Sequence, residues 1–127
     1  MIYGIGTDIT EVDRMEKAVS RNNSFKDRVF APDEQDYCEG NAITFQHYAA
    51  RFAAKEAFLK AFGTGLRNGL ELNEIVVVVD ELGKPSIELR GTTKQTCAEA
   101  GIGDIHLSLS HIKETAIAFV VIEKQEP

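Results

Sequence analysis

The sequence has no tryptophan, only two cysteines and three prolines in 127 residues. Cys38 and Cys97 are far apart and belong to no CxxC pattern, so neither a disulfide framework nor a zinc site is indicated. No stretch approaches the roughly 20 apolar residues that cross a bilayer, and the opening MIYGIGTDIT lacks the basic and apolar segments of a secretion signal. We therefore expect a cytoplasmic protein with free thiols and no membrane association.

Basic residues are outnumbered, 14 against 20 acidic ones, which gives a net charge of -6. A general nucleic-acid binder needs a basic surface to neutralise phosphates, so this balance argues against nucleic acid as a partner. The shares of hydrophobic (43%) and charged (27%) residues are near the globular average. We expect one domain spanning residues 1–127, because a chain of this length has little room for a second core.

The N-terminal segment alternates in the manner of a strand from Ile2 to Ile9. One face is expected to carry Tyr3, Ile5, Thr7 and Ile9, and the other Ile2, Gly4, Gly6 and Asp8. Glycines weaken a strand unless something approaches its backbone closely, so a helix or a ligand is expected over that bare face. A helix over residues 11–21 should follow, with Thr10 as a plausible N-cap.

Further along the chain, the strongest prediction is a long helix from about Phe45 to Phe62, stopped by Gly63 and Gly65. Two antiparallel hairpins are also expected. The remaining predicted elements are a loop or broken helix over 22–30, a short helix over 32–40, hairpins pairing 75–79 with 86–89 and 105–110 with 115–123, and a helix to Ala100 capped by Thr92 or Thr93. This pattern is that of an α+β fold in which a mostly antiparallel sheet packs on one long helix and shorter ones, in an undetermined strand order.

Two acidic residues are candidates for a metal site. Asp8 ends the glycine-bearing strand, and Glu56 shares a stripe of the long helix with Phe52 and Lys60 among small alanines. Two carboxylates with waters and phosphate oxygens suit Mg²⁺. The alternatives are a Glu56 to Lys60 ion pair on an exposed helix and an Asp8 that caps the next helix. Spacing does not decide between these interpretations.

Several residues could meet a phosphate. His111 follows Ser108 and Ser110 at the turn of the last hairpin, where a histidine could bind phosphate or move a proton. Lys60, Lys55 and Arg51 are expected to form a local basic cluster near Gly63-Thr64-Gly65, whose backbone amides could contact an anion. The alternatives are an ordinary surface histidine and a glycine pair that only stops the helix.

Three blocks of the sequence resemble the signature blocks of the bacterial holo-acyl-carrier-protein synthases. They are YGIGTDITEVDRM, RFAAKEAFLKAFGTGL and HLSLSHIKETAIAFVVIE, in the same order and spacing as in that family. The resemblance covers nearly the whole chain. It implies a 4′-phosphopantetheinyl transferase fold and the transfer of the 4′-phosphopantetheine arm of coenzyme A to a serine of apo acyl carrier protein, in support of fatty acid synthesis.

The resemblance also implies roles for individual residues. Asp8 and Glu56 would coordinate Mg²⁺, and Lys60 would neutralise charge on the pyrophosphate as the nucleotide, adenosine 3′,5′-bisphosphate, leaves. Arg51 and His111 would contact the coenzyme's phosphates, including the 3′-phosphate, and Glu56 or a metal-bound water is the candidate base. The coenzyme-binding set is completed by Gly63, Thr64 and Gly65.

In the same family the first helix presents arginines to an acidic helix of the carrier protein. Arg14 and Arg21 match that pattern, with help from Lys17, Lys26 and Arg28. Such a stripe speeds the encounter with an acidic partner, and the alternative is an ordinary solvated helix face. The resemblance further implies a homotrimer with active sites at the subunit interfaces.

The chain departs from the family pattern at two places. Thr115 stands where members commonly have tyrosine, and Phe30-Ala31 stands where they often have Leu-Thr. These differences bear on local packing more than on the chemistry. There are two competing functions. One is a metal-dependent hydrolase of nucleotide pyrophosphates, which would use the same acids with water as acceptor and need no carrier protein. The other is a non-catalytic module that keeps the fold, docks carrier proteins and binds no metal.

Overall fold

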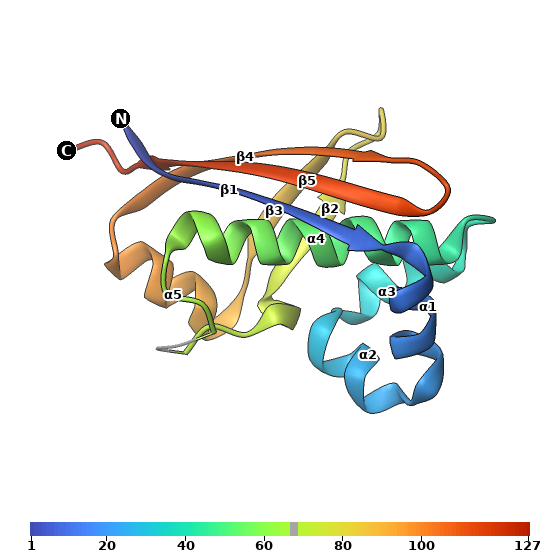
Figure 1. The fold of residues 1–127 in the computed structure, drawn as a ribbon. Helices are drawn as coiled ribbons and strands as arrows, with labels where there is room; N and C mark the ends of the chain where they lie inside the picture. The colour runs from blue at the N-terminus through green and yellow to red at the C-terminus, as the bar shows by residue number, and fades with distance from the viewer. Residues whose placement is uncertain (67–68) are drawn as a thin grey trace.

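The computed structural model describes residues 1–66 and 69–127 of the chain, and it has the predicted α+β architecture. A three-stranded sheet lies across a long central helix, with small helices at either end of that helix (Figure 1). The elements in chain order are β1 (Ile2–Glu11), α1 (Val12–Arg21), α2 (Asn23–Val29), α3 (Pro32–Glu39), α4 (Thr44–Phe62), the 3₁₀ turn η1 (Leu72–Glu74), β2 (Ile75–Val79), β3 (Pro85–Leu89), α5 (Gly91–Glu99), β4 (Ile102–His111) and β5 (Thr115–Lys124).

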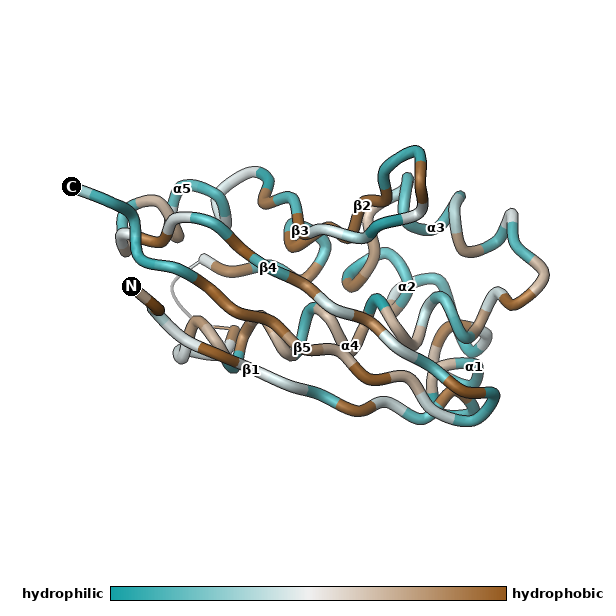
Figure 2. Tube along the Cα trace, turned by 90° about the horizontal axis from the view of Figure 1, so that it is seen from above, coloured by the Kyte–Doolittle hydropathy of each residue, from teal (hydrophilic) through white to brown (hydrophobic). Residues whose placement is uncertain are grey.

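The sheet joins the two ends of the chain. Its strand order is β1-β5-β4, with both pairs antiparallel, so the last strand is central and the first lies at the edge. Both predicted hairpins are confirmed, and β2 with β3 forms a separate two-stranded sheet beside β4 (Figure 2). None of the helices in the described part of the chain has the length and apolarity needed to span a bilayer.

The contact between β1 and α4 explains the two glycines of the first strand. A Cβ atom added to Gly4 would lie 1.9 Å from the carbonyl oxygen of Ala61, and one added to Gly6 would lie 2.0 Å from that of Ala57. Both distances are far inside van der Waals contact, so the strand and the helix backbone pack directly against each other. The predicted close approach over the bare strand face is therefore confirmed, and the neighbour is the long helix.

One part of the predicted strand pattern is wrong. The pairing of β1 with β5 shifts by one residue between Ile2 and Gly4, which is a β-bulge. Because of it, Tyr3 turns to the helix side, where its ring stacks on Phe62 at 5.8 Å, while Ile2 remains 60% exposed. Alternation alone assigned Tyr3 to the opposite face, since a bulge inserts a residue without changing the sequence period.

The helix ends follow local backbone chemistry. α4 stops at Gly63, which adopts the left-handed conformation with φ +98°, and the Gly63 amide donates to the Leu59 carbonyl. The predicted threonine caps are wrong. α1 begins after Glu11, because the hydroxyl of Thr10 donates to Asp8 instead.

At the start of α5, the helix begins one residue before Thr92, at Gly91, so Thr92 and Thr93 lie inside its first turn. Their hydroxyls donate to the carboxylate of Glu74, at 3.1 and 2.8 Å. The segment over 22–30, left open as a loop or a broken helix, forms α2, and the side chain of Asn22 caps it by accepting from the Phe25 amide.

A fully buried ion pair joins α3, α4 and β2. The amine of Lys55 donates to Glu34 at 2.8 Å and to the carbonyl oxygens of Leu72 and Ile75 at 2.9 and 2.6 Å. Glu34 also accepts from the amides of Ala31 and Val77. A buried charge is tolerated only when it is paired and hydrogen-bonded, and these contacts meet that condition at both ends. The pair fixes α4 against the helices on its flank.

The family departure at Phe30-Ala31 concerns the same region. Phe30 is 1% exposed, and its ring lies 4.8 Å from that of Tyr48. Ala31 stands at the N-cap of α3, where it has no hydroxyl to accept from the helix, but Glu34 still accepts from its backbone amide. The departure thus removes a side-chain cap and leaves the buried ion pair intact.

We predict that Gly6→Ala destabilises the protein by about 3 kcal/mol or more, because its Cβ would overlap the Ala57 carbonyl and force β1 away from α4. The free energy of unfolding from urea titration measures this. Gly40→Ala is the matched control, since its Cβ would lie 3.1 Å from its nearest neighbour and should cost less than about 1 kcal/mol. Equal losses in the two variants would contradict the close packing.

Candidate active site

Asp8 and Lys60 meet where β1 crosses α4. The Lys60 amine donates to Asp8 Oδ1 at 3.1 Å and to the Thr7 carbonyl at 3.0 Å. The other carboxylate oxygen of Asp8 accepts from the Thr10 hydroxyl at 3.0 Å. The ion-pair partner of Lys60 is therefore Asp8 on the neighbouring strand, and the predicted alternative of an isolated Glu56 to Lys60 pair is wrong.

Glu56 lies beside this pair, one turn before Lys60 on the same helix. Burial raises the pKa of Glu56 above its ordinary value, and the neighbouring Asp8 carboxylate raises it further, while Lys60 acts in the opposite direction. Two carboxylates held close together with one ammonium repel each other in the free protein. The arrangement is electrostatically incomplete and favours an added cation or an added proton.

Two cavities meet at Glu56. The first, of about 300 Å³, lies between β1, α1 and α4, and its lining includes Asp8, Arg14, Met15, Phe52 and Glu56. The second, of about 490 Å³, lies at the C-terminal end of α4 and is lined by Glu56, Leu59, Lys60, Gly63, Gly65 and Leu66. The side chain of Glu56 thus lines both cavities. Groups bound in the two cavities would come together at this carboxylate.

The residues present fit a divalent cation that is held jointly with a ligand. Within residues 1–66 and 69–127 no group of three or more His, Cys, Asp or Glu side chains could hold a metal ion. Mg²⁺, however, is commonly bound by one or two carboxylates together with substrate phosphates and waters. Asp8 and Glu56 supply that number of carboxylates. Burial and the charge of Asp8 raise the pKa of Glu56, so a nearby cation would stabilise its ionised form.

The predicted basic cluster near Gly63 is wrong, because two of its members are used elsewhere. Lys55 is 0% exposed in its ion pair with Glu34, and Arg51 is 3% exposed on another side of α4. Lys60 alone of the three lines the cavity beside Gly63 and Gly65. The hydroxyl of Thr64 donates to the Gly65 carbonyl, so it is turned to its own loop.

Arg51 and His111 belong to a second group of side chains, outside the linings of these two cavities. The guanidinium of Arg51 lies 4.2 Å from the centroid of the Tyr37 ring. The ring of His47 lies 5.2 Å from that of Tyr37 and 6.4 Å from that of His111. His111 also lines a shallow pocket of about 200 Å³ with Thr115, one of the two places at which the chain departs from the family pattern.

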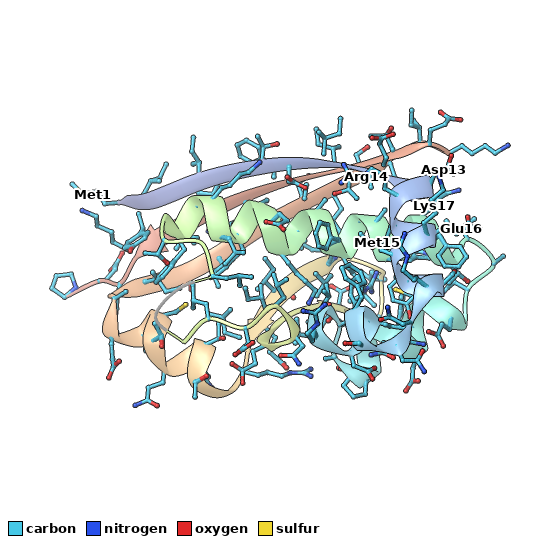
Figure 3. All side chains as sticks on the ribbon, turned by 60° about the horizontal axis from the view of Figure 1, so that its bottom comes forward. Met1, Asp13, Arg14, Met15, Glu16 and Lys17 are labelled. Carbon is cyan, nitrogen blue, oxygen red and sulfur yellow. The ribbon has the colours of Figure 1, made fainter. Side chains whose placement is uncertain are left out.

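The docking residues predicted on the first helix, Arg14 and Arg21, lie on α1. Figure 3 labels Arg14 at the start of this helix. Arg14 and Arg21 are exposed, and Met15 on the inner side is 4% exposed. Arg14 also lines the first cavity, so the basic face of α1 leads directly to Asp8 and Glu56. Lys26 is partly committed to an ion pair with Glu39 at 3.2 Å, and Arg28 donates to the Ser24 carbonyl.

Sequence reasoning missed three residues of these two groups. Thr10 was assigned to a helix cap, although its hydroxyl fixes the Asp8 carboxylate. Tyr37 and His47 drew no functional interpretation, because their contacts with Arg51 and His111 join segments that are remote in the sequence. A histidine one turn before Arg51 on the same helix face was the one available signal.

Comparison with known proteins agrees with this fold. A model of the 4′-phosphopantetheinyl transferase superfamily matches residues 4–120. The holo-[acyl-carrier-protein] synthase of Geotalea daltonii is 51% identical over 125 residues, which cover 98% of this chain and 100% of that protein. The fold is accordingly that of a 4′-phosphopantetheinyl transferase.

Solved structures identify the family within this superfamily. The holo-[acyl-carrier-protein] synthase of Neisseria meningitidis superposes with a TM-score of 0.90 at 38% identity, covering 98% of this chain and 100% of that one. The Bacillus anthracis enzyme, solved in complex with CoA (3′,5′-ADP), gives 0.80 at 36% identity, with 98% and 99% coverage. The chain belongs to the holo-[acyl-carrier-protein] synthase family.

We predict that Glu56→Gln stabilises the metal-free protein at neutral pH by about 0.5–1 kcal/mol. The pKa of Glu56 is higher in the folded than in the unfolded chain, so its ionised form opposes folding above the folded pKa. Below about pH 4 both states are protonated and the gain should vanish.

Thermal unfolding at several pH values in the presence of EDTA checks this. Glu99→Gln is the control, because it removes the same charge from an exposed position on α5. A gain of the same size in both variants would attribute the effect to net charge and contradict the local explanation.

Proposed function

We propose that Asp8, Glu56 and Lys60 form the centre at which this holo-[acyl-carrier-protein] synthase transfers 4′-phosphopantetheine from coenzyme A to a serine of apo acyl carrier protein. The observation that carries this assignment is the position of Glu56 between two cavities, one beside the exposed arginines of α1 and one beside Lys60 and the glycines that end α4. A reaction between a protein and a small molecule needs two such approaches to one point.

The reaction breaks the pyrophosphate of coenzyme A. The serine hydroxyl attacks the β-phosphate, the P–O bond to the nucleotide breaks, and adenosine 3′,5′-bisphosphate leaves with the negative charge. Lys60 lies one turn from Glu56 and carries the charge that stabilises this leaving group. Glu56, or a water on the metal that it would hold, is the candidate acceptor of the serine proton.

Asp8 and Glu56 are the residues that would hold Mg²⁺. A divalent cation there would neutralise the pyrophosphate oxygens and bring them within reach of Lys60. The Thr10 hydroxyl and the Lys60 amine orient the two oxygens of Asp8 from opposite sides. Such outer contacts fix the geometry of a ligating carboxylate before the metal and the substrate bind.

We predict that Asp8→Asn lowers turnover at least 100-fold while leaving the thermal unfolding temperature nearly unchanged. Intact-mass spectrometry of apo acyl carrier protein, incubated with the protein, coenzyme A and Mg²⁺, measures the transfer as the gain of one phosphopantetheine. EDTA should abolish the gain, and Asp104→Asn, at an exposed position of β4, should retain it.

Other outcomes distinguish the competing functions. Consumption of coenzyme A without modification of the carrier would identify a hydrolase. Binding of the carrier with coenzyme A untouched would identify a docking module. Full activity of Asp8→Asn would contradict the assignment of this acidic pair to the metal.

We further propose that α1 docks the carrier protein. Arg14 is exposed at the mouth of the first cavity, and Arg21 is exposed in the last turn of the helix. An acidic helix of the partner laid along α1 would face both arginines and place its serine near Glu56. The overall charge of -6 makes such a local basic face the favourable place for an acidic partner.

We predict that Arg14→Glu raises the KM for carrier protein about tenfold or more and changes the KM for coenzyme A less than about twofold. Steady-state kinetics with each substrate varied in turn measures both constants. The effect should weaken as salt rises, because the contact is electrostatic. Lys94→Glu, at an exposed position on α5, is the control for charge reversal elsewhere. Equal changes in both KM values would contradict docking on α1.

A homotrimer is part of the proposal. The outer face of the sheet carries an exposed apolar stripe, formed by Ile5, Ile9, Ile117 and Phe119 on β1 and β5. Exposed apolar residues gathered on a sheet face are typical of an interface. Ile9 and Ile117 also line the shallow pocket of His111, so a neighbouring subunit on this stripe would bring its own bound coenzyme towards His111.

That arrangement would explain why Arg51 and His111 form a group apart from Asp8 and Glu56. In a trimer with sites at the interfaces, the acidic centre of one subunit would face the phosphate-binding residues of the next. A cytoplasmic location is also proposed, and the two free, buried cysteines agree with a reducing compartment.

A further inference from the structure

The side chains around His47 form a cluster of basic and aromatic residues that the metal centre does not use. Arg51 reaches it from one turn further along α4, Tyr37 from α3, and His111 from the end of β4. Arg51 and His111 are the charged groups that act on the pKa of His47, and Tyr37 is in ring contact with it. The Arg51 guanidinium lies over the Tyr37 ring, 4.2 Å from its centroid, and the His47 ring is nearly perpendicular to that ring, at an interplanar angle of 86°.

Arg51 indicates that this cluster is built for an anion. The side chain is only 3% exposed, yet its Nε has no hydrogen-bond partner. A buried guanidinium nitrogen without an acceptor costs free energy, and such groups are normally paired. A ligand that supplies oxygen atoms would satisfy it. Because Arg51 and two histidines face one another, that ligand should carry more than one negative charge.

We propose that His47 is a further phosphate-binding residue of this enzyme, which together with Arg51 and His111 holds a terminal phosphate group and takes up a proton when that phosphate binds. This inference rests on the proposed contact of Arg51 and His111 with the 3′-phosphate of coenzyme A. It assigns a role to a residue that the sequence motifs leave out. Tyr37 acts as the platform that keeps the guanidinium and the imidazole at a fixed spacing.

The electrostatics of the cluster agree with proton uptake. Burial lowers the pKa of His47, and the charges of Arg51 and His111 lower it further. The imidazole is therefore neutral in the free protein at physiological pH. A phosphate dianion brings compensating negative charge, which favours the imidazolium and adds a charge-assisted hydrogen bond. By linkage, the phosphate must then bind more tightly as the pH falls.

The test compares two ligands that differ only in this group. Isothermal titration calorimetry gives the dissociation constants of coenzyme A and of dephospho-coenzyme A, which lacks the 3′-phosphate, at about pH 6.5 and 8. The dissociation constant of dephospho-coenzyme A divided by that of coenzyme A measures how much the 3′-phosphate contributes to binding. This quotient is the ratio used below. In the wild type we expect this ratio to rise about 3–10-fold when the pH is lowered from 8 to 6.5. A rise of this size is expected for one linked proton.

His47→Phe preserves an aromatic ring against Tyr37 and removes the titrating group. We expect its ratio to change less than about twofold over the same pH range. An unchanged wild-type pH dependence in this variant would overturn the proposal and reduce His47 to a packing residue. An absence of pH dependence in the wild type would overturn it as well.

Two further variants separate this inference from the proposed function. His111→Gln, at an exposed position, should lower the ratio at every pH if the cluster binds the 3′-phosphate at all. If the ratio for His111→Gln equals that of the wild type at every pH, the cluster does not bind the 3′-phosphate, and the role proposed for His47 is overturned as well. If His111→Gln lowers the ratio but His47→Phe keeps the pH dependence of the wild type, the assignment of the 3′-phosphate to this cluster stands and only the role of His47 is overturned.

His106→Gln is the matched control for loss of a histidine. This ring pairs with Glu123 at 2.7 Å on the β4–β5 hairpin, away from the cluster. It should keep the full wild-type pH dependence. If His106→Gln lost as much of the pH dependence as His47→Phe, the pH dependence would come from the overall charge of the protein, and the proposal would be overturned.

Discussion

The direct packing of the first strand on the long helix is the contact on which the functional site depends. Gly4 and Gly6 carry no side chain, so the backbone of β1 rests on the carbonyl oxygens of Ala57 and Ala61. At this separation Asp8, two residues further along the same strand face, reaches the amine of Lys60 and lies beside Glu56. A Cβ at either glycine would separate the strand from the helix and, with it, the two carboxylates.

The site gains its chemistry at a cost in stability. Asp8 and Glu56 repel each other in a half-buried position, and Lys60 compensates only part of their charge. The helix that carries two of these residues is held from its other side by the buried pair of Lys55 and Glu34, all of whose polar contacts are satisfied. One side of the helix thus carries a fully hydrogen-bonded ion pair, and the other carries carboxylates that repel each other. This arrangement suits an enzyme whose site is completed when metal and substrate bind.

Much of the fold follows from local pattern. The long helix, both hairpins and the short helix at Pro32 agree with the predicted bounds within three residues, the largest difference being the start of β4 at Ile102, because their periodicity and stop signals are strong. The predicted cap at Thr10 is wrong because its hydroxyl donates to Asp8, two residues earlier in the chain. The errors at Tyr3 and Thr92 have another cause, since a tertiary neighbour, Phe62 or Glu74, contacts a side chain that local rules assigned elsewhere. The expected basic cluster failed for the same reason, since Lys55 found a buried carboxylate.

The sequence by itself determined the α+β class, the bare strand face, the acidic pair and, through its three motif blocks, the family. Periodicity, glycine placement and motif spacing are properties of the chain, and they need no knowledge of which segments meet. The tertiary structure alone decided that Lys60 pairs with Asp8, that Glu56 stands between two cavities, and that Arg51 joins His47, Tyr37 and His111. These are contacts between segments remote in sequence, and they exist only once the strands and helices have packed.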